Sequence, residues 1–441
     1  MKRYWYLLVI ILNLLMIIIP LRVVHAGEEG VKLYTLEQSI KDAFENNSSV
    51  KAKEEKVSES EYAKEEAKAG FLPTFSTSYS YTRLKEVTSV ELEGRGMLEF
   101  GDKNNYQWQT TVTQPIFTGY AITSAYELAK LGIDQSKIAL ELEKLDLALK
   151  VKEAYYNILK TDKAVDVANS AVESLKSHLE VAKNFYEVGM IPVNDLLKVE
   201  VEVANAQHNL IQAQNASRIS RVYFNILLSN PVDSPVEVED ILAYTREAPD
   251  FTASMEKALR KRPEIRSLDI SDIQIDQQIN LTKSKYYPEA AFTYNYIKAG
   301  DTPAVSGTSF QKANTWQATV GLSWTFWDWN KTRNSVNQGE SMKRQLSQTR
   351  KTLEDGIKLE LQSAILGLKE AEEKIPTAQK AVDQAEENLR VSEERYKAQV
   401  TTSTEVLDAQ TLLSQARMNY YNALYDHNLA KAGLLRAIGE Y

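Results

Sequence analysis

The residue types that most often do chemistry in proteins are few in this chain, and they lack the spacings that chemistry needs. The 441 residues include no cysteine, which excludes disulfide bridges, a lipid-modified cysteine and thiolate metal sites. The four histidines, His25, His178, His208 and His427, are not at ligand spacing for zinc. We find no nucleophile with a base partner and no phosphate-binding loop. The sequence therefore predicts a protein that is not an enzyme, with no metal site and no cofactor.

The N-terminus and the charge balance indicate an exported protein. Lys2 and Arg3 precede an apolar run that ends at Pro20, and Val24-His25-Ala26 has the small-residue spacing of a signal-peptidase site. We expect residues 1–26 to be a signal peptide that is removed. The alternative is a retained anchor helix, for which the run is short. Loss of the three basic residues in this segment changes the net charge from −8 to −11, which argues against nucleic acid as a partner.

A long internal repeat organises the chain. Phe71-Leu72-Pro73-Thr74-Phe75 aligns with Tyr286-Tyr287-Pro288-Glu289-Ala290 at an offset of 215 residues, and Tyr186 to Leu228 aligns with Tyr396 to Ile438 at an offset of 210. We predict a first repeat over 27–230, a proline-containing linker over 231–250, and a second repeat over 251–441.

Each repeat contains two segments that alternate with a period of two, as membrane β-strands do. The predicted strands are 73–83 and 106–117 in the first repeat, and 289–298 and 315–327 in the second. One face of each segment is apolar or aromatic, the other carries Ser, Thr, Gln and Asn, and no charge occurs between the segment ends. A soluble β-sandwich, the alternative, would show charges on its solvent face. The lengths suit tilted strands that cross a hydrocarbon core of about 30 Å. Leu84–Asn105 and Gly300–Asn314 are predicted to be exposed loops.

Helices occupy the rest of each repeat. We predict shorter helices over 36–70 and 252–285, very long helices over 120–186 and 330–396, and returning helices over 193–229 and 403–438. Apolar residues in the long helices recur every three or four positions, which indicates a seam between coiled-coil neighbours. Pro376 predicts a kink in the second long helix. Four strands cannot close a membrane barrel, so we expect several subunits to pool their strands and to continue them into a helical tube.

These features resemble the TolC family of outer-membrane efflux proteins over essentially all of residues 33–440. The resemblance is carried by the repeat, by Gln114-Pro115-Ile116-Phe117-Thr118-Gly119, and by the two turns between the long and returning helices. It implies a homotrimer in outer-membrane lipid, with a twelve-strand barrel and a twelve-helix periplasmic tunnel. It also implies a periplasmic adaptor and an inner-membrane transporter of the RND, ABC or MFS class as partners, and drugs, ions or proteins as cargo.

The resemblance assigns roles to residues of the second turn, Tyr396 to Ala409. Glu405 and Asp408 match acidic residues that form rings at the periplasmic constriction, and Tyr396 and Asp195 match a tyrosine and an aspartate that tie neighbouring helix pairs together. Thr401 departs from the family pattern, because members place an arginine there, which implies a weaker or differently built lock. Read alone, Asp195 could be a first-turn carboxylate favoured by the helix dipole, and Asp408 a solvated surface charge.

Two further sets of residues are expected to contact partners. The turn tips are expected to dock the adaptor, although an exposed turn can equally have no partner: Gly189, Met190, Ile191, Pro192, Gln399, Val400, Thr401 and Thr402. Aromatic side chains are expected at the two membrane interfaces, with Trp108 and Trp316 at the outer one and Trp324, Phe326 and Trp327 at the periplasmic one. The competing hypothesis is a non-channel coiled-coil protein, for example a periplasmic adaptor or a surface-layer spacer. An adaptor would have a single helical hairpin flanked by two halves of a β-domain with charged solvent faces.

Overall fold

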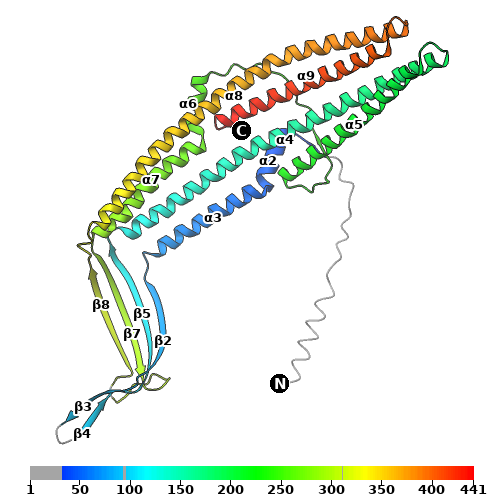
Figure 1. Ribbon diagram of the computed structural model, residues 1–441. Helices are drawn as coiled ribbons and strands as arrows, with labels where there is room; N and C mark the ends of the chain where they lie inside the picture. The colour runs from blue at the N-terminus through cyan, green and yellow to red at the C-terminus, as the bar shows by residue number, and fades with distance from the viewer. Residues whose placement is uncertain (1–31, 93–95, 310) are drawn as a thin grey trace, which may run out of the picture.

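The protein is elongated, with a β-sheet at one end and the tips of two helical hairpins at the other (Figure 1). The computed structural model describes residues 32–92, 96–309 and 311–441, so the predicted signal peptide 1–26 lies outside the described residues. Along the chain, a strand hairpin followed by a long helical hairpin occurs twice. The predicted mainly helical fold of two repeats is therefore confirmed.

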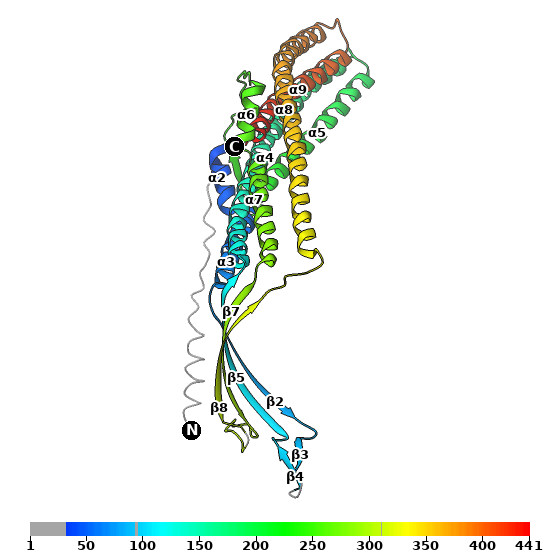
Figure 2. The same ribbon diagram turned by 90° about the vertical axis from the view of Figure 1, so that its left-hand side faces the viewer.

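One antiparallel sheet contains the four strands that carry the alternating pattern. Its order is β2 (Thr74–Arg83), β5 (Asn104–Thr118), β7 (Glu289–Gly300) and β8 (Asn314–Ser323). The pairing of β5 with β7 joins the two repeats, and β2 and β8 form the edges. The sheet is strongly twisted (Figure 2), as long antiparallel sheets are. Because the strands form a single sheet, they do not make the sandwich of two packed sheets considered above.

The strand register sorts the side chains into two chemically distinct faces. Opposed residues in antiparallel strands share a face, and Tyr79 lies opposite Trp108 while Phe292 lies opposite Val320. On the other face, Asn295 Oδ1 accepts hydrogen bonds from Gln109 Nε2 at 3.0 Å and from Thr111 Oγ1 at 2.7 Å. One face is therefore mainly aromatic and aliphatic, with Lys298 opposite Trp108 near the end remote from the helices, and the other is mainly a hydrogen-bonded layer of uncharged polar groups.

Two irregularities modify the predicted strands. A bulge between Pro115 and Phe117 leaves Ile116 unpaired, because Pro115 has no N–H to donate to the ladder. The prediction that the last strand extends to residue 327 is wrong, since β8 ends at Ser323. Ser323 is opposite Glu289, the first residue of β7, so the chain beyond it has no strand to pair with in this subunit.

The predicted single helices 36–70 and 252–285 are each divided in two. Asn47 separates α2 (Leu36–Asn46) from α3 (Ser48–Ala69) and caps α3 by accepting from Ser49 N at 2.9 Å. Arg262 separates α6 (Phe251–Lys261) from α7 (Pro263–Lys283), because a residue before proline is driven out of the helical region. A short 3₁₀ turn, η1 (Ser284–Tyr286), follows α7. The two breaks are 215 residues apart, so they belong to the repeat.

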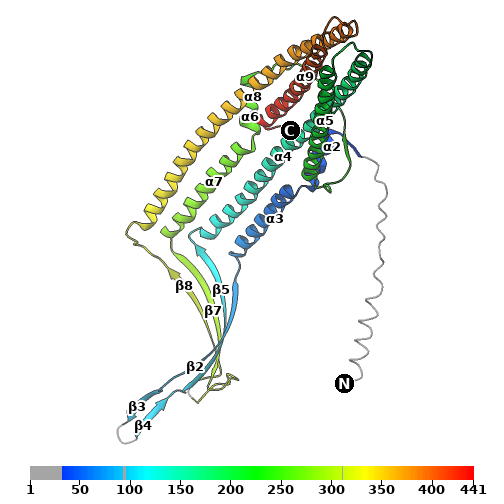
Figure 3. The ribbon, with the colours of Figure 1, turned by 45° about the vertical axis from the view of Figure 1, so that its right-hand side comes forward.

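Two 67-residue helices, α4 (Ala121–Glu187) and α8 (Lys331–Lys397), run most of the length of the helical part, and each spans about 100 Å. α8 is continuous through Pro376. The returning helices are α5 (Val193–Leu228) and α9 (Ser403–Ala437). Next to the sheet, α3, α4, α7 and α8 lie side by side, whereas towards the tips the order is α5, α4, α9 and α8 (Figures 1 and 3).

Gly119 and Tyr120 form the junction between β5 and α4, and both adopt positive φ. A side chain at Gly119 would place its Cβ 2.4 Å from Ser284 O, so glycine is required there. In the second repeat Trp329 and Asn330 have positive φ at the corresponding junction. The same backbone turn therefore redirects each repeat from sheet to helix.

A buried core lies midway along the helices, where the linker crosses them. The 231–250 segment contributes β6 (Val236–Val238), which pairs in parallel with β1 (Lys32–Tyr34). Tyr155 on α4 is fully buried beneath this pair, and its hydroxyl shares its single proton between two acceptors, Tyr34 O at 3.0 Å and Glu239 O at 2.9 Å. Burial raises the pKa of the Tyr155 hydroxyl to about 12.

The loop predicted over Leu84–Asn105 contains a second hairpin, β3 (Thr88–Leu92) and β4 (Gly96–Phe100), which extends beyond the end of the four-stranded sheet (Figure 3). Among the helices that the structure describes, none is both long enough and apolar enough to cross a bilayer.

Candidate gate at the tips of the helical hairpins

The two tips are built by the same turn in both repeats. Gly189 ends the first turn region with φ of 73°, and Gln399 takes the corresponding conformation in the second with φ of 58°. Gln399 is neither glycine nor asparagine, so this backbone costs about 1–2 kcal/mol. Its Nε2 donates to Met190 Sδ of the other tip at 2.7 Å. The strained residue therefore also joins the tips of the two hairpins.

The residues expected to dock an adaptor lie at this far end of the molecule (Figure 1). Met190 and Val400 expose 58% and 64% of their surface. Apolar side chains on such a narrow tip have no neighbour within the described chain to cover them. Their place suits a docking role, which stays a prediction.

Glu405 lies in the first turn of α9, and its carboxylate is already bound. Arg395 Nη1, near the end of α8, donates to Glu405 Oε1 at 2.7 Å, and the Thr401 hydroxyl contacts Glu405 Oε2. Position 401, where the family pattern has an arginine, therefore holds a hydroxyl that binds the same carboxylate as Arg395. The cation expected at the turn comes from the last turn of the preceding helix.

Asp408 lies one turn further along α9 and is exposed. It lines a groove between α5 and α9 together with Asn194, Leu197 and Thr404. The two acidic residues that the sequence grouped together thus differ: Glu405 is neutralised by Arg395, whereas Asp408 faces open space with its charge.

Tyr396 is 3% exposed and lies between the two helical hairpins. Its ring contacts the His178 ring on α4 at a centroid distance of 4.6 Å and the Phe185 ring at 5.6 Å. Burial raises the pKa of its hydroxyl, a contact with Ser403 works against that shift, and the negative charge of Asp195 adds to it. No well-formed hydrogen bond reaches Tyr396 Oη from the described residues, so Asp195 acts on it here through its charge alone.

The hydrogen bond that links the two hairpins beside Tyr396 joins His178 and Ser403. His178 Nε2 lies 2.6 Å from Ser403 Oγ, at the start of α9. Burial lowers the pKa of His178 to about 4, so the ring is neutral at neutral pH. Sequence reasoning missed His178, Ser403 and Arg395. Ser403 at a helix start and Arg395 ten residues before Glu405 were visible signals, whereas the pairing of His178 with a residue 225 positions away was not.

The aromatic residues expected at the membrane interfaces fall into two groups. Trp108 and Trp316 lie near the starts of β5 and β8, at the end of the sheet remote from the helices. Trp324, Phe326 and Trp327 follow the end of β8, next to the junction with α8, and all three are exposed. Trp329, which the sequence analysis did not single out, extends this group, and its ring contacts that of Trp327.

In the part of the chain that the structure describes, no group of three or more His, Asp or Glu side chains could hold a metal ion. The site thus consists of a carboxylate neutralised within its turn, a free carboxylate in a groove, and a buried contact between two hairpins. Their role in a gate stays a prediction.

A chain with a two-faced sheet, two repeats and long helical hairpins is typical of channel-forming envelope proteins, and the comparisons with known proteins agree. The model of the family described as outer membrane efflux protein matches residues 39–224 and 255–440, once in each repeat. The chain therefore belongs to the outer membrane efflux protein family and is an outer-membrane protein.

Individual relatives are distant in sequence but similar in fold. The outer membrane protein TolC of Vibrio cholerae is 23% identical over 66% of this chain and 67% of its own length. TolC of Escherichia coli is 20% identical over 68% of this chain and 63% of its own length, so the chain matches somewhat less than two thirds of that relative. The CmeC outer membrane channel of Campylobacter jejuni superposes with a TM-score of 0.78 at 16% identity, covering 92% of this chain and 85% of that one. None of these comparisons supports the alternative of a soluble adaptor.

Proposed function

We propose that three copies of this chain form an exit channel across the outer membrane. Their strands would pool into a twelve-strand barrel, and their helices into a twelve-helix tunnel in the periplasm. A periplasmic adaptor would bind the tips, and an inner-membrane transporter of the RND, ABC or MFS class would supply small molecules or proteins for export.

The sheet carries this proposal. Within the described chain, β2 and β8 each have ten residues with a neighbour on one side only. Unpaired strand edges do not persist in hydrocarbon, where each unpaired backbone group costs several kcal/mol. Pairing the β8 edge of one copy with the β2 edge of the next removes these edges and leaves the aromatic face towards lipid and the Gln, Asn and Thr face towards a lumen. The family match in both repeats supports the same assembly.

The proposal is tested on the full-length protein in lipid nanodiscs. Native mass spectrometry should give three chains per particle, and the same preparation should open ion-conducting channels in planar bilayers. A stable single chain that retains its strand content, or a trimer that conducts nothing, would contradict the proposed function.

Asp408 gives the proposal a specific electrostatic test. Three copies of a free carboxylate at the constriction would attract cations and bind multivalent ions that block the pore. Asp408→Ala should therefore lower cation selectivity and weaken block by a trivalent cation while the trimer remains intact. Asp426→Ala, an exposed aspartate further along α9, serves as the matched control. Unchanged selectivity and block in Asp408→Ala would remove Asp408 from the constriction.

A further inference from the structure

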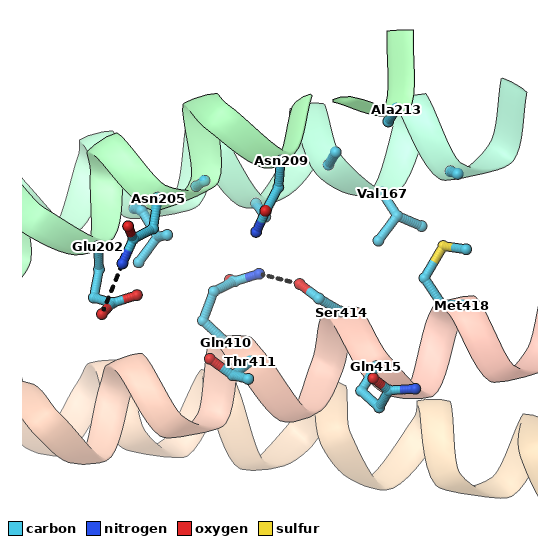
Figure 4. A pocket seen from close by; sticks show the side chains of 15 residues that line it. Val167, Glu202, Asn205, Asn209, Ala213, Gln410, Thr411, Ser414, Gln415 and Met418 are labelled. Carbon is cyan, nitrogen blue, oxygen red and sulfur yellow. Dashed lines mark hydrogen bonds between the residues drawn. The ribbon is translucent and has the colours of Figure 1, made fainter. Parts of the chain in front are cut away.

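A second groove lies between the two helical hairpins, on the side of Asp408 that is remote from the tips. α4 forms its floor, α5 and α9 form its walls, and its volume is about 340 Å³. The floor is apolar and made of small or aliphatic side chains, among them Val167, Ala171 and Leu175. Figure 4 shows Asn205 and Asn209 from α5 and Gln410 from α9 pointing into the space between the helices. The groove therefore pairs an apolar floor with amide-bearing walls.

Gln410 has an acceptor that nothing in the described chain satisfies. The residue is 6% exposed, and its Nε2 donates to Ser414 Oγ at 3.2 Å. Its Oε1 is buried and has no hydrogen-bond partner. Buried acceptors are nearly always paired in native proteins, because an unpaired one is destabilising. An oxygen that is held in this position at the edge of a groove is suited to a donor that arrives from outside the chain.

The negative charge of the second groove favours a positively charged ligand. Of the fifteen residues that line it, Glu202 is the only charged one, and its Oε1 accepts from Asn205 Nδ2 at 3.4 Å. Glu202 and Thr411 also line the groove of Asp408, so the two grooves adjoin. Lys198 is the only cation among the residues that line the groove of Asp408. The carboxylates of Asp408 and Glu202 therefore both line these adjoining grooves, and the apolar floor formed by α4 lies on the side remote from the tips.

We propose that this groove is a binding site for small organic cations that carry N–H donors. The apolar body of the ligand rests on Val167, Ala171 and Leu175, an N–H group donates to Gln410 Oε1, and the positive charge lies towards Glu202. A groove of this volume accommodates a molecule of drug-like size. Binding itself requires no channel activity; only export of the bound ligand would rest on the proposed function.

Ethidium is a suitable probe, because it is a planar cation with two amino groups. Its binding to the full-length protein in nanodiscs is measured by fluorescence anisotropy, with empty nanodiscs as the blank. Gln410→Met keeps the side-chain length and removes the acceptor, and it should weaken binding roughly five-fold, which is the contribution of one neutral hydrogen bond. Gln207→Met, outside the groove on α5, is its control and should bind normally.

Glu202→Gln should weaken ethidium binding roughly three-fold at low ionic strength and less at high salt, because the carboxylate is partly exposed and its attraction is screened. Glu200→Gln makes the same charge change outside the groove and should leave the affinity unaltered. If ethidium binds equally well to wild type, Gln410→Met and Glu202→Gln, the groove is not its site and the inference is wrong.

A thiol placed in the groove locates the ligand directly, since the chain has no cysteine of its own. Thr411→Cys introduces a thiol where the two grooves meet, and Leu412→Cys introduces one on the neighbouring exposed position outside them. Ethidium should slow alkylation of the first thiol and not of the second. Equal rates with and without ethidium at position 411 would overturn the inference. If the protein conducts ions but shows neither the affinity changes nor the protection of the thiol at position 411, the binding site is refuted and the channel is not. If it shows both binding results but conducts no ions, the channel is refuted and the binding site is not.

Discussion

At the scale of single residues, the tip of the second hairpin pairs the carboxylate of Glu405 with a cation from a position that the family pattern does not predict. The family pattern has an arginine at the position of Thr401, and its absence here predicts a differently built lock. The structure supplies Arg395 from the last turn of α8, which pairs with Glu405 while Thr401 contacts the same carboxylate. The turn thus keeps a cation beside Glu405, whereas Asp408 is exposed in its groove.

Arg395→Gln should release the charge of Glu405 with little loss of stability. The pair is about half exposed, and such ion pairs contribute about 0.2–1 kcal/mol. In a trimer the change would add three uncompensated carboxylates near the constriction, so cation selectivity in planar bilayers should rise. Arg390→Gln breaks the comparable exposed pair with Glu387 and is the control. Equal selectivity in the two variants would show that Glu405 lies outside the ion path.

His178 should make the contact between the hairpins sensitive to acid. Its pKa is about 4 in the folded protein, below the ordinary value of 6.5, because the ring is buried. The unfolded chain therefore takes up a proton at higher pH than the folded one. The stabilisation is fully present above about pH 6.5, declines as the pH falls towards 4, and is lost below it, a change of about 3 kcal/mol per chain.

Thermal unfolding of the full-length protein, followed from pH 7.5 to pH 4, measures this effect. His178→Gln keeps a polar side chain near Ser403 without titrating, so the decline of the melting midpoint between pH 6.5 and pH 4 should become shallower. His208→Gln replaces an exposed histidine and should keep the wild-type slope. A wild-type slope in His178→Gln would mean that other groups cause the acid sensitivity.

At the scale of elements, the two repeats share the position at which a helix is interrupted. Asn47 and Arg262 interrupt their helices at corresponding positions, but they do so by different chemistry. Asn47 caps α3, and its Nδ2 donates to Leu227 O at 2.8 Å. Arg262 is 3% exposed and ion-paired to Glu264 and Glu360. The first break is thus fixed by a neutral cap, and the second by the buried guanidinium of Arg262, whose ion pair with Glu360 ties the break to α8.

The two breaks should therefore differ in their sensitivity to substitution. Arg262→Met removes the buried guanidinium that pairs with the partly exposed carboxylates of Glu264 and Glu360, and it should cost about 2 kcal/mol, because Arg436 still binds both carboxylates. Asn47→Ala removes a cap and should cost about 1 kcal/mol. Differential scanning calorimetry should therefore show the larger fall in melting temperature for Arg262→Met. The reverse order would indicate that the ion pairs around Arg262 contribute little.

The sequence predicted the strands and helices whose residue patterns depend on near neighbours and continue over many residues. The alternation in 289–298 and the apolar spacing in the long helices depend only on neighbouring residues, so strands and helices could be identified together with the repeat. Long-range partners could not be identified. The strand Val236–Val238 is recognisable only beside Lys32–Tyr34, and β8 ends at Ser323 because its partner strand begins at Glu289. The contact of His178 with Ser403 and the groove around Gln410 could not be predicted either, because both depend on residues that are far apart in the sequence.

At the scale of the whole molecule, groups of tryptophan residues lie near the two ends of the four-stranded sheet. Trp316 lies near the start of β8, at the end remote from the helices, whereas Trp324 and Trp327 lie between the end of β8 and the start of α8, and the apolar face of β8 runs between the two groups. Aromatic side chains with a polar atom favour the boundary between lipid and water. We therefore predict that the membrane surrounds the band of the molecule between the two groups.

Single-tryptophan variants in vesicles containing brominated lipids test this placement. With the other tryptophans replaced by phenylalanine, Trp316 and Trp324 should each be quenched best by bromines near the headgroups. Val320→Trp, in the middle of β8 on the apolar face, should be quenched best by bromines deep in the acyl chains. Gln317→Trp, on the polar face of the same strand, should be quenched little by any lipid, because that face would line the lumen.

The four positions test orientation as well as depth. Deep quenching at position 320 together with weak quenching at 317 requires the aromatic and aliphatic face to contact lipid, since the two residues lie on opposite faces of one strand. Equal quenching at 317 and 320 would reject that orientation, and deep quenching at Trp324 would reject its place at the periplasmic interface. Because each comparison is made within one strand and its extension, an overall change in protein insertion would alter all four positions together and could not imitate the predicted pattern.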